Sequence, residues 1–256
     1  MLIFTVGDVV AEGGIRILER TLRSFKKLKG IHFTIVNGEN AAGMGITGEQ
    51  AERIFNAGAD VITLGNHAFS KREMLAYVED ERYILRPENL THVNPGRGYG
   101  VFIAENGKQV GLLCLIGRVF MQNHADNPFY IADRHIEKFD TNVILVEIHG
   151  EATSEKAALA WYLDGRVSAV YGTHTHVQTA DERVLPKGTG FITDLGMTGP
   201  INSILGMEPQ SSVDRLLGHP QISYKSAKGP CMLQGALFEI DDNIGRCISV
   251  ERITLE

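Results

Sequence analysis

Two histidines that stand two positions apart, His174 and His176, have the residue type and spacing of metal ligands. They follow the apolar run 167–171 in the sequence Gly-Thr-His-Thr-His-Val. Imidazole is the commonest protein ligand for transition metals, and a buried strand that ends in a glycine-containing loop would bring both rings near one point. The alternative is two polar residues on one face of an edge strand, and an isolated His-x-His favours it. Other parts of the chain must decide between the two.

Further apolar runs also end in side chains that can bind a metal or carry a proton. In chain order these side chains are Asp8, Glu39, Asn40, Asn66, His67 and His149. Each of them alone has a structural explanation, such as a helix cap, a turn or a hydrogen-bonded core histidine. Open α/β sheets, however, bind ligands at the carboxyl ends of their strands, so the repeated coincidence favours one shared site.

The number of these donor groups indicates more than one metal ion. Three imidazoles, two carboxylates and two amides exceed what one four- to six-coordinate ion can use. The set therefore predicts two ions about 3.5–4 Å apart, with one carboxylate as a bridge. Mixed nitrogen and oxygen ligands fit divalent or mixed-valence ions of Fe, Mn, Zn, Ni or Co, and the ligand types alone do not choose among these metals.

The elements that must position these residues can be read from hydrophobic periodicity and capping signals. In the first half of the chain and around the last histidines, apolar runs predict strands at 2–6, 32–36, 61–64, 143–148 and 167–171. Predicted helices span 13–29, 47–56, 70–78 and 154–162, with Thr47 and Ser70 as N-caps and Gly58 just past the second helix.

Turn residues predict hairpins in the second half of the chain. Asn106-Gly107 separates two apolar runs within 99–116, and residues 186–188 separate two more. We expect 117–141 to be a long surface connection, 194–221 to be rich in loops, and 222–255 to form three strands with a turn at 241–243. Together these elements predict one α/β (α+β) domain over residues 1–256, with two packed mixed sheets flanked by helices.

Composition excludes several other classes of protein. The 256 residues carry a formal net charge of −6, so nonspecific binding to nucleic acid is not expected. The sequence contains no run of about 18 apolar residues, the length that a membrane-spanning helix needs. The three cysteines are odd in number and lie far apart in apolar runs. They are typical of buried thiols in a reducing compartment, so we expect a cytoplasmic protein.

The candidate residues and their neighbours resemble the calcineurin-like binuclear metallophosphoesterases. The motifs that match are Gly7-Asp8, Gly38-Glu39-Asn40, Gly65-Asn66-His67, His149-Gly150-Glu151 and Gly172-Thr173-His174-Thr175-His176. The longer runs 37–42, 149–156, 172–181 and 193–200 are similar to the bacterial YmdB-type branch, described as 2′,3′-cyclic-nucleotide 2′-phosphodiesterases. The resemblance covers nearly the whole chain and implies the four-layer fold of that family.

Two positions depart from the pattern of the broad superfamily. Its first strand ends in Asp-x-His, whereas Asp8 is followed here by Val9 and Val10. Its second motif supplies an aspartate, whereas this chain has Glu39. In the YmdB-type branch the amide of the next residue, here Asn40, replaces the missing imidazole.

The resemblance implies two ligand sets that share Glu39 as the bridging carboxylate. Metal 1 would be held by Asp8, Glu39, Asn40 and His176, and metal 2 by Glu39, Asn66, His149 and His174. Alternation along an extended chain, read with the resemblance, also sends His174 and His176 to different metals.

The function that follows is metal-assisted hydrolysis of a 2′,3′-cyclic nucleotide or a related small phosphodiester. A hydroxide held by both ions would attack phosphorus in line, while the ions neutralise charge on the phosphoryl oxygens. His67 is the candidate general acid for the leaving alkoxide. Its alternative role is to hold a neighbouring ligand by a hydrogen bond. No residue is assigned to substrate binding.

Two other functions are also compatible with these residues. A phosphomonoesterase or phosphoprotein phosphatase would use the same centre and differ only in its substrate pocket. A regulatory scaffold would bind metal or nucleotide without significant turnover. The sequence does not fix the oligomeric state, so a homo-oligomer also remains open.

Overall fold

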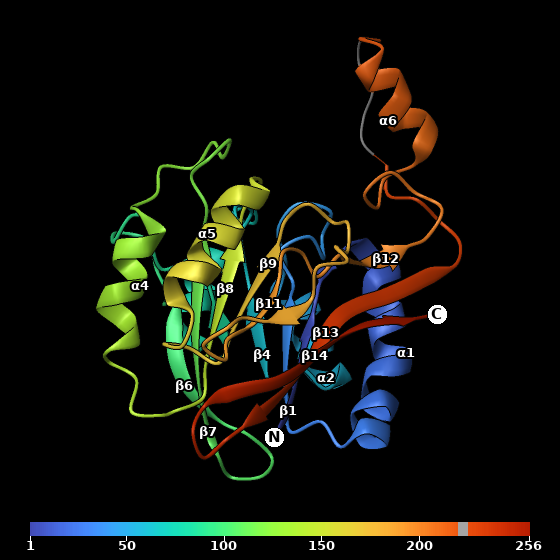
Figure 1. The fold of residues 1–256 in the computed structure, drawn as a ribbon. Coiled ribbons are helices and arrows are strands. Elements are labelled where there is room, and N and C mark those ends of the chain that lie inside the picture. The colour runs from blue at the N-terminus through green and yellow to red at the C-terminus, as the bar shows by residue number, and fades with distance from the viewer. Residues whose placement is uncertain (220–224) are drawn as a thin grey trace.

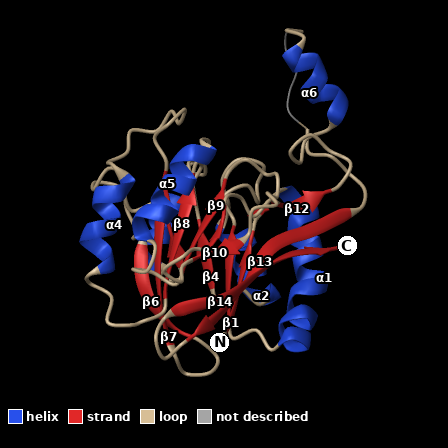
Figure 2. Ribbon diagram, viewed as in Figure 1, coloured by secondary structure: helices blue, strands red, loops and turns tan. Residues whose placement is uncertain are grey.

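Two mixed β-sheets pack face to face, with helices on their outer faces (Figures 1 and 2). The computed structural model describes residues 1–219 and 225–256. The first sheet has the order β2 (Asp8–Val9), β12 (Met197–Pro200), β13 (Cys231–Asp241), β1 (Leu2–Val6), β3 (Phe33–Asn37), β4 (Val61–Thr63) and β5 (Ile84–Leu85), and β14 (Arg246–Leu255) pairs with β13. The second has the order β10 (Arg183–Val184), β11 (Gly190–Ile192), β9 (Ala169–Thr173), β8 (Ile144–His149), β7 (Gln109–Ile116) and β6 (Tyr99–Ile103).

Three hydrophobic clusters hold the four layers together. Between the sheets, buried residues such as Ile35 and Leu145 belong to one cluster. A second cluster joins the first sheet to α1 (Ala11–Lys29) and α2 (Gly48–Ala57), and a third joins the second sheet to α4 (Pro128–Ile136) and α5 (Thr153–Leu163). The expected arrangement of two packed mixed sheets flanked by helices is thus confirmed.

Local signals in the sequence explain where the helix α2 begins and ends. The Thr47 hydroxyl accepts a hydrogen bond from Gln50 N at 3.2 Å, and the Gln50 side chain accepts one from Thr47 N. This capping box satisfies amide groups that have no partner in the first turn. Gly58 ends the helix with φ 118°, a left-handed conformation that glycine adopts without strain.

Strand direction places the carboxyl ends of several strands at one edge of the molecule. β1, β3 and β4 are parallel neighbours in the first sheet, and β7, β8 and β9 are parallel neighbours in the second. In Figure 1 the visible arrowheads of β8 and β9 point to the upper edge. The loops that follow these strands carry the candidate residues.

The expected hairpins are present. β6 and β7 are antiparallel and are joined across Asn106-Gly107, and β10 and β11 are antiparallel across residues 185–189. The predicted turn at 241–243 also joins two antiparallel strands, β13 and β14. Of the three strands expected over 222–255, however, the described residues form two; residues 222–224 lie outside the described part of the chain.

Two stretches expected to be loops contain regular structure. Residues 117–141 include α4, where Pro128 occupies the first turn and therefore sacrifices no helical hydrogen bond. Asn127 caps this helix by accepting from Phe129 N at 3.0 Å. Residues 194–221 include β12 and α6 (Pro209–Leu216), a helix that projects from the body of the molecule (Figure 1).

The third helix begins later than its sequence suggests. α3 spans Met74–Asp80, and its N-cap position is Glu73, not Ser70. The Ser70 hydroxyl lies 3.4 Å from His67 Nδ1, so it contacts the candidate site and does not cap a helix.

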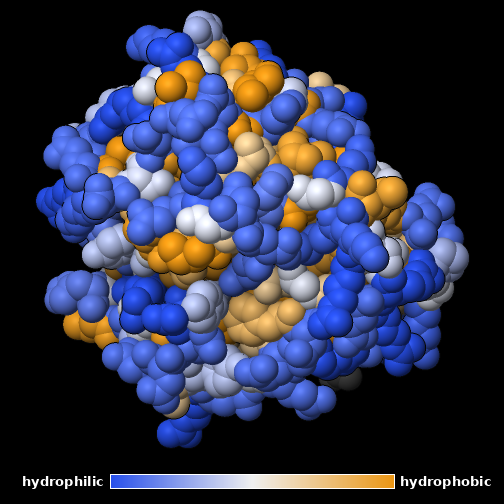
Figure 3. Space-filling view, turned by 90° about the horizontal axis from the view of Figure 1, so that it is seen from below, coloured by the Kyte–Doolittle hydropathy of each residue, from blue (hydrophilic) through white to orange (hydrophobic). Residues whose placement is uncertain are grey.

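The opposite end of the molecule, seen in Figure 3, is mostly hydrophilic, and its hydrophobic residues form separate patches. None of the helices within residues 1–219 and 225–256 combines the length with the hydrophobicity that a membrane span requires.

Candidate metal centre

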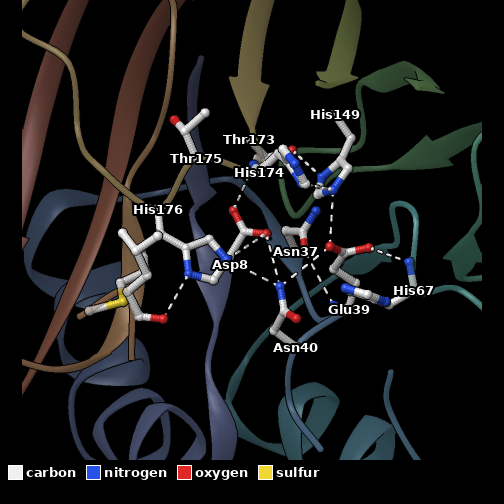
Figure 4. A network of polar contacts seen from close by, with 12 residues as sticks. Asp8, Asn37, Glu39, Asn40, His67, His149, Thr173, His174, Thr175 and His176 are labelled. Atoms are coloured by element: carbon white, nitrogen blue, oxygen red, sulfur yellow. Dashed lines mark hydrogen bonds and ion pairs between the residues drawn. The ribbon is translucent and has the colours of Figure 1, made fainter. Parts of the chain in front are cut away.

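The structure brings together every side chain that the sequence proposed for the site. Asp8 lies in β2, directly after β1; Glu39 and Asn40 follow β3; Asn66 and His67 follow β4; His149 ends β8; His174 and His176 follow β9. Figure 4 shows most of these groups pointing toward one another from both sheets. Asp8, Glu39 and His149 have no solvent exposure.

One group of donor atoms converges on His149 Nε2. Glu39 Oε1 lies 2.9 Å from this nitrogen, Asn66 Oδ1 lies 2.8 Å from it, and His174 Nδ1 lies 3.1 Å from it. The ligand atoms of Glu39, His149 and His174 all lie within 4.8 Å of one another. These are the four residues of the expected metal 2 set.

The orientation of His149 leaves its Nε2 lone pair directed at the site. The Thr173 hydroxyl donates to Glu147 Oε1 at 3.0 Å, so its oxygen accepts from His149 Nδ1 at 2.9 Å. With the proton on Nδ1, Nε2 of the neutral ring is an acceptor that faces other acceptors. A cation at this point would satisfy all of them.

A second group of donor atoms surrounds the Asn40 amide. Asn40 Nδ2 lies 3.2 Å from His176 Nε2, 3.3 Å from Glu39 Oε1 and 3.5 Å from Asp8 Oδ1. The His176 ring is oriented by Nδ1, which donates to the Leu205 carbonyl at 3.2 Å, so its Nε2 lone pair faces the site. Turning the amide by 180° would direct its oxygen inward and complete a second set of ligands.

Glu39 links the two groups, because its Oε1 lies near both His149 and Asn40. Its other oxygen accepts a hydrogen bond from His67 N at 3.0 Å. In the same way Asp8 uses Oδ2 to accept from His174 N at 3.1 Å and leaves Oδ1 facing the Asn40 group. The donor set therefore fits two adjacent cations with Glu39 shared between them.

Electrostatics within the site favour bound positive charge. Burial raises the pKa of Asp8, and the nearby His176 and His149 oppose this effect. Burial acts to lower the pKa of His149, but the Glu39 carboxylate overcomes burial and raises it, so a cation that binds at Nε2 must displace a proton from this ring. The pKa of His174 is lowered to about 4, first by burial and then by His149. A neutral His174 is the form that binds a metal.

The loop that carries His174 and His176 is not extended. His174 has φ 98° and His176 has φ 62°, values that are unfavourable for residues with a Cβ. The two rings do lie in different groups of ligands, as the sequence suggested. The suggested reason, alternation of side chains along an extended chain, is wrong. Two left-handed residues turn the rings apart.

A buried ion pair fixes this strained loop. Lys156 Nζ of α5 lies 2.8 Å from Asp194 Oδ2, and both side chains are at most 1% exposed. Asp194 Oδ2 also accepts from Thr175 N at 3.1 Å and from the Thr175 hydroxyl at 2.7 Å, between the two histidines. Lys156 further donates to the Thr173 carbonyl at 3.1 Å.

The sequence did not identify several residues that orient the ligands. Glu147 Oε1 accepts from Asn37 Nδ2 at 2.8 Å and from Thr173, and it thereby connects the two sheets beneath the site. His174 Nε2 lies 3.2 Å from Glu151 Oε2. The available signal was Glu147 itself, a charged residue inside an apolar strand and on the same face as His149.

Comparison with known proteins shows which family the chain is similar to. Residues 4–253 match the model of the family described as YmdB-like protein. The chain is 42% identical to the 2′,3′-cyclic-nucleotide 2′-phosphodiesterase of Bacillus subtilis (strain 168), over 100% of this chain and 97% of that protein.

Two solved structures share the fold. The crystal structure of a hypothetical protein from Thermus thermophilus superimposes with a TM-score of 0.94 and 38% identity, covering 100% of this chain and 99% of that one. The crystal structure of a novel phosphatase from Mycoplasma pneumoniae has a TM-score of 0.93 and 32% identity, covering 100% and 93%. From the family match and this full-length similarity, the chain belongs to the YmdB-like family.

Proposed function

We propose that this protein is a metal-dependent phosphodiesterase that hydrolyses 2′,3′-cyclic nucleotides or closely related small phosphodiesters. The observation that carries the proposal is the convergence of two groups of side chains that can bind a metal on the shared Glu39 carboxylate. The name of the Bacillus subtilis relative supports the choice of substrate class. The proposed ligands are Asp8, Glu39, Asn40, Asn66, His149, His174 and His176.

The residues divide the chemical work as follows. Two bound cations would lower the pKa of water and neutralise charge on the phosphoryl oxygens. The fully buried carboxylates of Asp8 and Glu39 would balance the charge of those cations. His149, His174 and His176 are each held by a hydrogen bond or ion pair at the ring nitrogen that faces away from the site, which fixes the direction of the lone pair.

His67 is proposed as the proton donor to the departing ribose oxygen. Its Nε2 lies 3.2 Å from Asn66 Nδ2, and Asn66 directs its oxygen toward His149. The amide therefore donates to His67, which places the proton of a neutral ring on Nδ1. To donate through Nε2, the ring must be protonated and must leave this hydrogen bond when substrate binds.

Two substrates distinguish proton donation by His67 from orientation of Asn66. A general acid matters for a ribose alkoxide and little for p-nitrophenolate, which leaves without protonation. If His67 is the acid, His67→Ala lowers kcat about 10²- to 10⁴-fold for 2′,3′-cyclic AMP and far less for bis-p-nitrophenyl phosphate. Equal losses on both substrates, together with loss of bound metal, would assign His67 to orientation alone.

The experiment that tests the function measures turnover of 2′,3′-cyclic AMP by the purified protein loaded with Mn²⁺ or Fe²⁺. We expect metal-dependent formation of a nucleoside monophosphate, and near-complete loss of activity in Asp8→Ala and Glu39→Gln. Turnover that survives both substitutions would overturn the enzyme proposal. Metal or nucleotide binding without turnover in the wild type would favour a regulatory scaffold.

A phosphomonoesterase is the second candidate, and the phosphatase described from Mycoplasma pneumoniae favours it. The comparison of bis-p-nitrophenyl phosphate with p-nitrophenyl phosphate separates the two functions. We expect a higher kcat/KM for the diester. A clear preference for the monoester would replace the phosphodiesterase proposal with that of a phosphatase.

A further inference from the structure

A short loop beside the proposed metal centre is tied to the backbone of two of its ligands. Gly117, the residue after β7, donates its N–H to the His149 carbonyl at 2.9 Å. Asn123 Nδ2 lies 3.5 Å from the Asn66 carbonyl. Both contacts involve residues of the His149 group, so the loop 117–123 forms part of the rim of the site. In Figure 1 the green segment that leads into α4 stands at the same edge as the top of β8.

The beginning of this loop is firmly held. The Glu155 carboxylate, in the first turns of α5, accepts hydrogen bonds from Arg118 N at 3.0 Å and from Val119 N at 3.1 Å. A turn then follows in which Met121 N donates to the Arg118 carbonyl at 3.3 Å. These contacts fix the position of the residue at the tip of the turn.

That residue, Phe120, has two unfavourable properties. Its side chain is 85% exposed, so it contributes little to the core. Its φ is 62°, at the third position of the turn, where glycine or asparagine is the favoured residue. An exposed aromatic ring buries little apolar area, and a left-handed backbone is strained, so Phe120 is unfavourable for folding on both counts. Strained residues concentrate at sites of function.

We propose that Phe120 is a specificity-determining residue that stacks on the base of a nucleotide substrate. This inference rests on the proposed function and names the group that the site recognises beyond the phosphodiester. In a 2′,3′-cyclic nucleotide the base is attached to C1′, next to the C2′ that carries the phosphate, so a base projects from the metal centre toward its rim. Exposed aromatic rings bind bases by stacking, and purines offer the larger surface.

The charge of the loop suits a phosphorylated ligand. The exposed Arg118 lies two residues before the tip, and within residues 1–219 and 225–256 its guanidinium forms no ion pair. Arginine beside an aromatic ring is a common combination for nucleotide binding, because it contributes charge and a planar surface.

The test compares substrates with and without a base. Steady-state kinetics on the metal-loaded protein would use 2′,3′-cyclic AMP, 2′,3′-cyclic CMP and the 2′,3′-cyclic phosphate of methyl ribofuranoside. Phe120→Ala should raise KM for cyclic AMP at least about fivefold, leave kcat nearly unchanged, and abolish the preference for the purine. The substrate without a base should be unaffected.

Two further variants serve as controls. Phe120→Trp should retain the wild-type KM, because another aromatic ring can stack. Val119→Ala removes the neighbouring exposed side chain in the same turn and should change nothing. Isothermal titration with adenosine 3′-monophosphate should show the same loss of affinity in Phe120→Ala alone, independent of turnover.

The kinetics distinguish a failure of the proposed function from a failure of the base-stacking role of Phe120. If the wild type does not hydrolyse any cyclic nucleotide, the proposed function fails. If the wild type is active and Phe120→Ala has an unchanged KM for cyclic AMP, the base-stacking role is wrong. The role is also wrong if Phe120→Ala weakens turnover of the substrate without a base to the same extent, since that result indicates a structural effect on the metal centre.

Discussion

At the scale of single residues, each histidine of the site is oriented by a contact on one ring nitrogen, so that the other ring nitrogen faces the site. His149 and His176 each direct Nε2 at the site because Nδ1 is occupied by Thr173 or by the Leu205 carbonyl. His174 presents Nδ1 because its Nε2 faces Glu151. Fixed rings lose little freedom when a cation binds, which favours tight binding.

The division of the two neighbouring histidines leads to the first prediction. His174→Ala should deplete mainly the metal held with His149, and His176→Ala mainly the metal held with Asn40. We expect an affinity loss of at least about 10- to 100-fold at the affected site, the range found when even an outer partner of a ligand is removed. Calorimetric titration of each variant with Mn²⁺ measures this. Identical loss of both ions in both variants would contradict separate sites.

A second prediction concerns the close approach of Gly65 to the ligands. A Cβ added at Gly65 would overlap the His149 ring and the Glu39 carboxylate. Gly65→Ala should therefore displace both ligands and abolish tight metal binding. The matched control is Gly150→Ala, next to His149, where a Cβ would be 3.5 Å from its nearest neighbour, an ordinary van der Waals contact. Metal content after dialysis should fall in the first variant only; equal content in both would refute this packing.

At the scale of elements, the site is held by structures that pair one sheet with the other. Glu147 of β8 binds Asn37 of β3. Lys156 of α5 reaches Asp194, which holds the loop after β9. The strained φ values of His174 and His176 persist because these buried contacts outweigh them.

The third prediction follows from this buried ion pair. Lys156→Met should destabilise the protein by about 3–5 kcal/mol, because Asp194 would be left as an uncompensated buried charge. Lys27→Met removes the same charge from an exposed face of α1 and should change stability by less than about 0.5 kcal/mol. Urea unfolding of the metal-free proteins provides the measurement. Equal midpoints for the two variants would rule out the proposed role.

Strand ends were predictable from the sequence, whereas several helices were not. Apolar runs that end in glycine and a polar residue revealed the strands and brought Asp8, Glu39 and His149 together. The helix α4 was missed because Pro128 was interpreted as a loop residue, although proline also suits a first helical turn. The turned conformation of His174 and His176 depends on Asp194, twenty and eighteen residues further along the chain, and no local pattern reports such a contact.

At the scale of the whole molecule, metal binding and folding should be linked. The site draws its donors from both sheets, so its geometry exists only when the sheets are packed together. It also buries the two carboxylates of Asp8 and Glu39 close to each other. Cations would remove the repulsion between them and bind only the folded chain.

The fourth prediction is that chelation lowers thermal stability. A ligand present at 100 times its Kd stabilises the folded state by about 2.7 kcal/mol for each site. The melting temperature measured by calorimetry should therefore fall when EDTA removes the ions from the wild type. It should change much less in the double variant Asp8→Asn, Glu39→Gln, in which the carboxylates are neutral amides. An equal fall in both proteins would argue against metal binding at this site.

The most direct test of the proposed binuclear centre is a crystal of the metal-loaded, catalytically active protein, measured with anomalous scattering at the absorption edge of the bound metal. We expect two peaks about 3.5–4 Å apart, both within bonding distance of Glu39, one beside His174 and the other beside His176. A single peak, or peaks away from these residues, in a protein that hydrolyses 2′,3′-cyclic AMP would contradict the proposed centre.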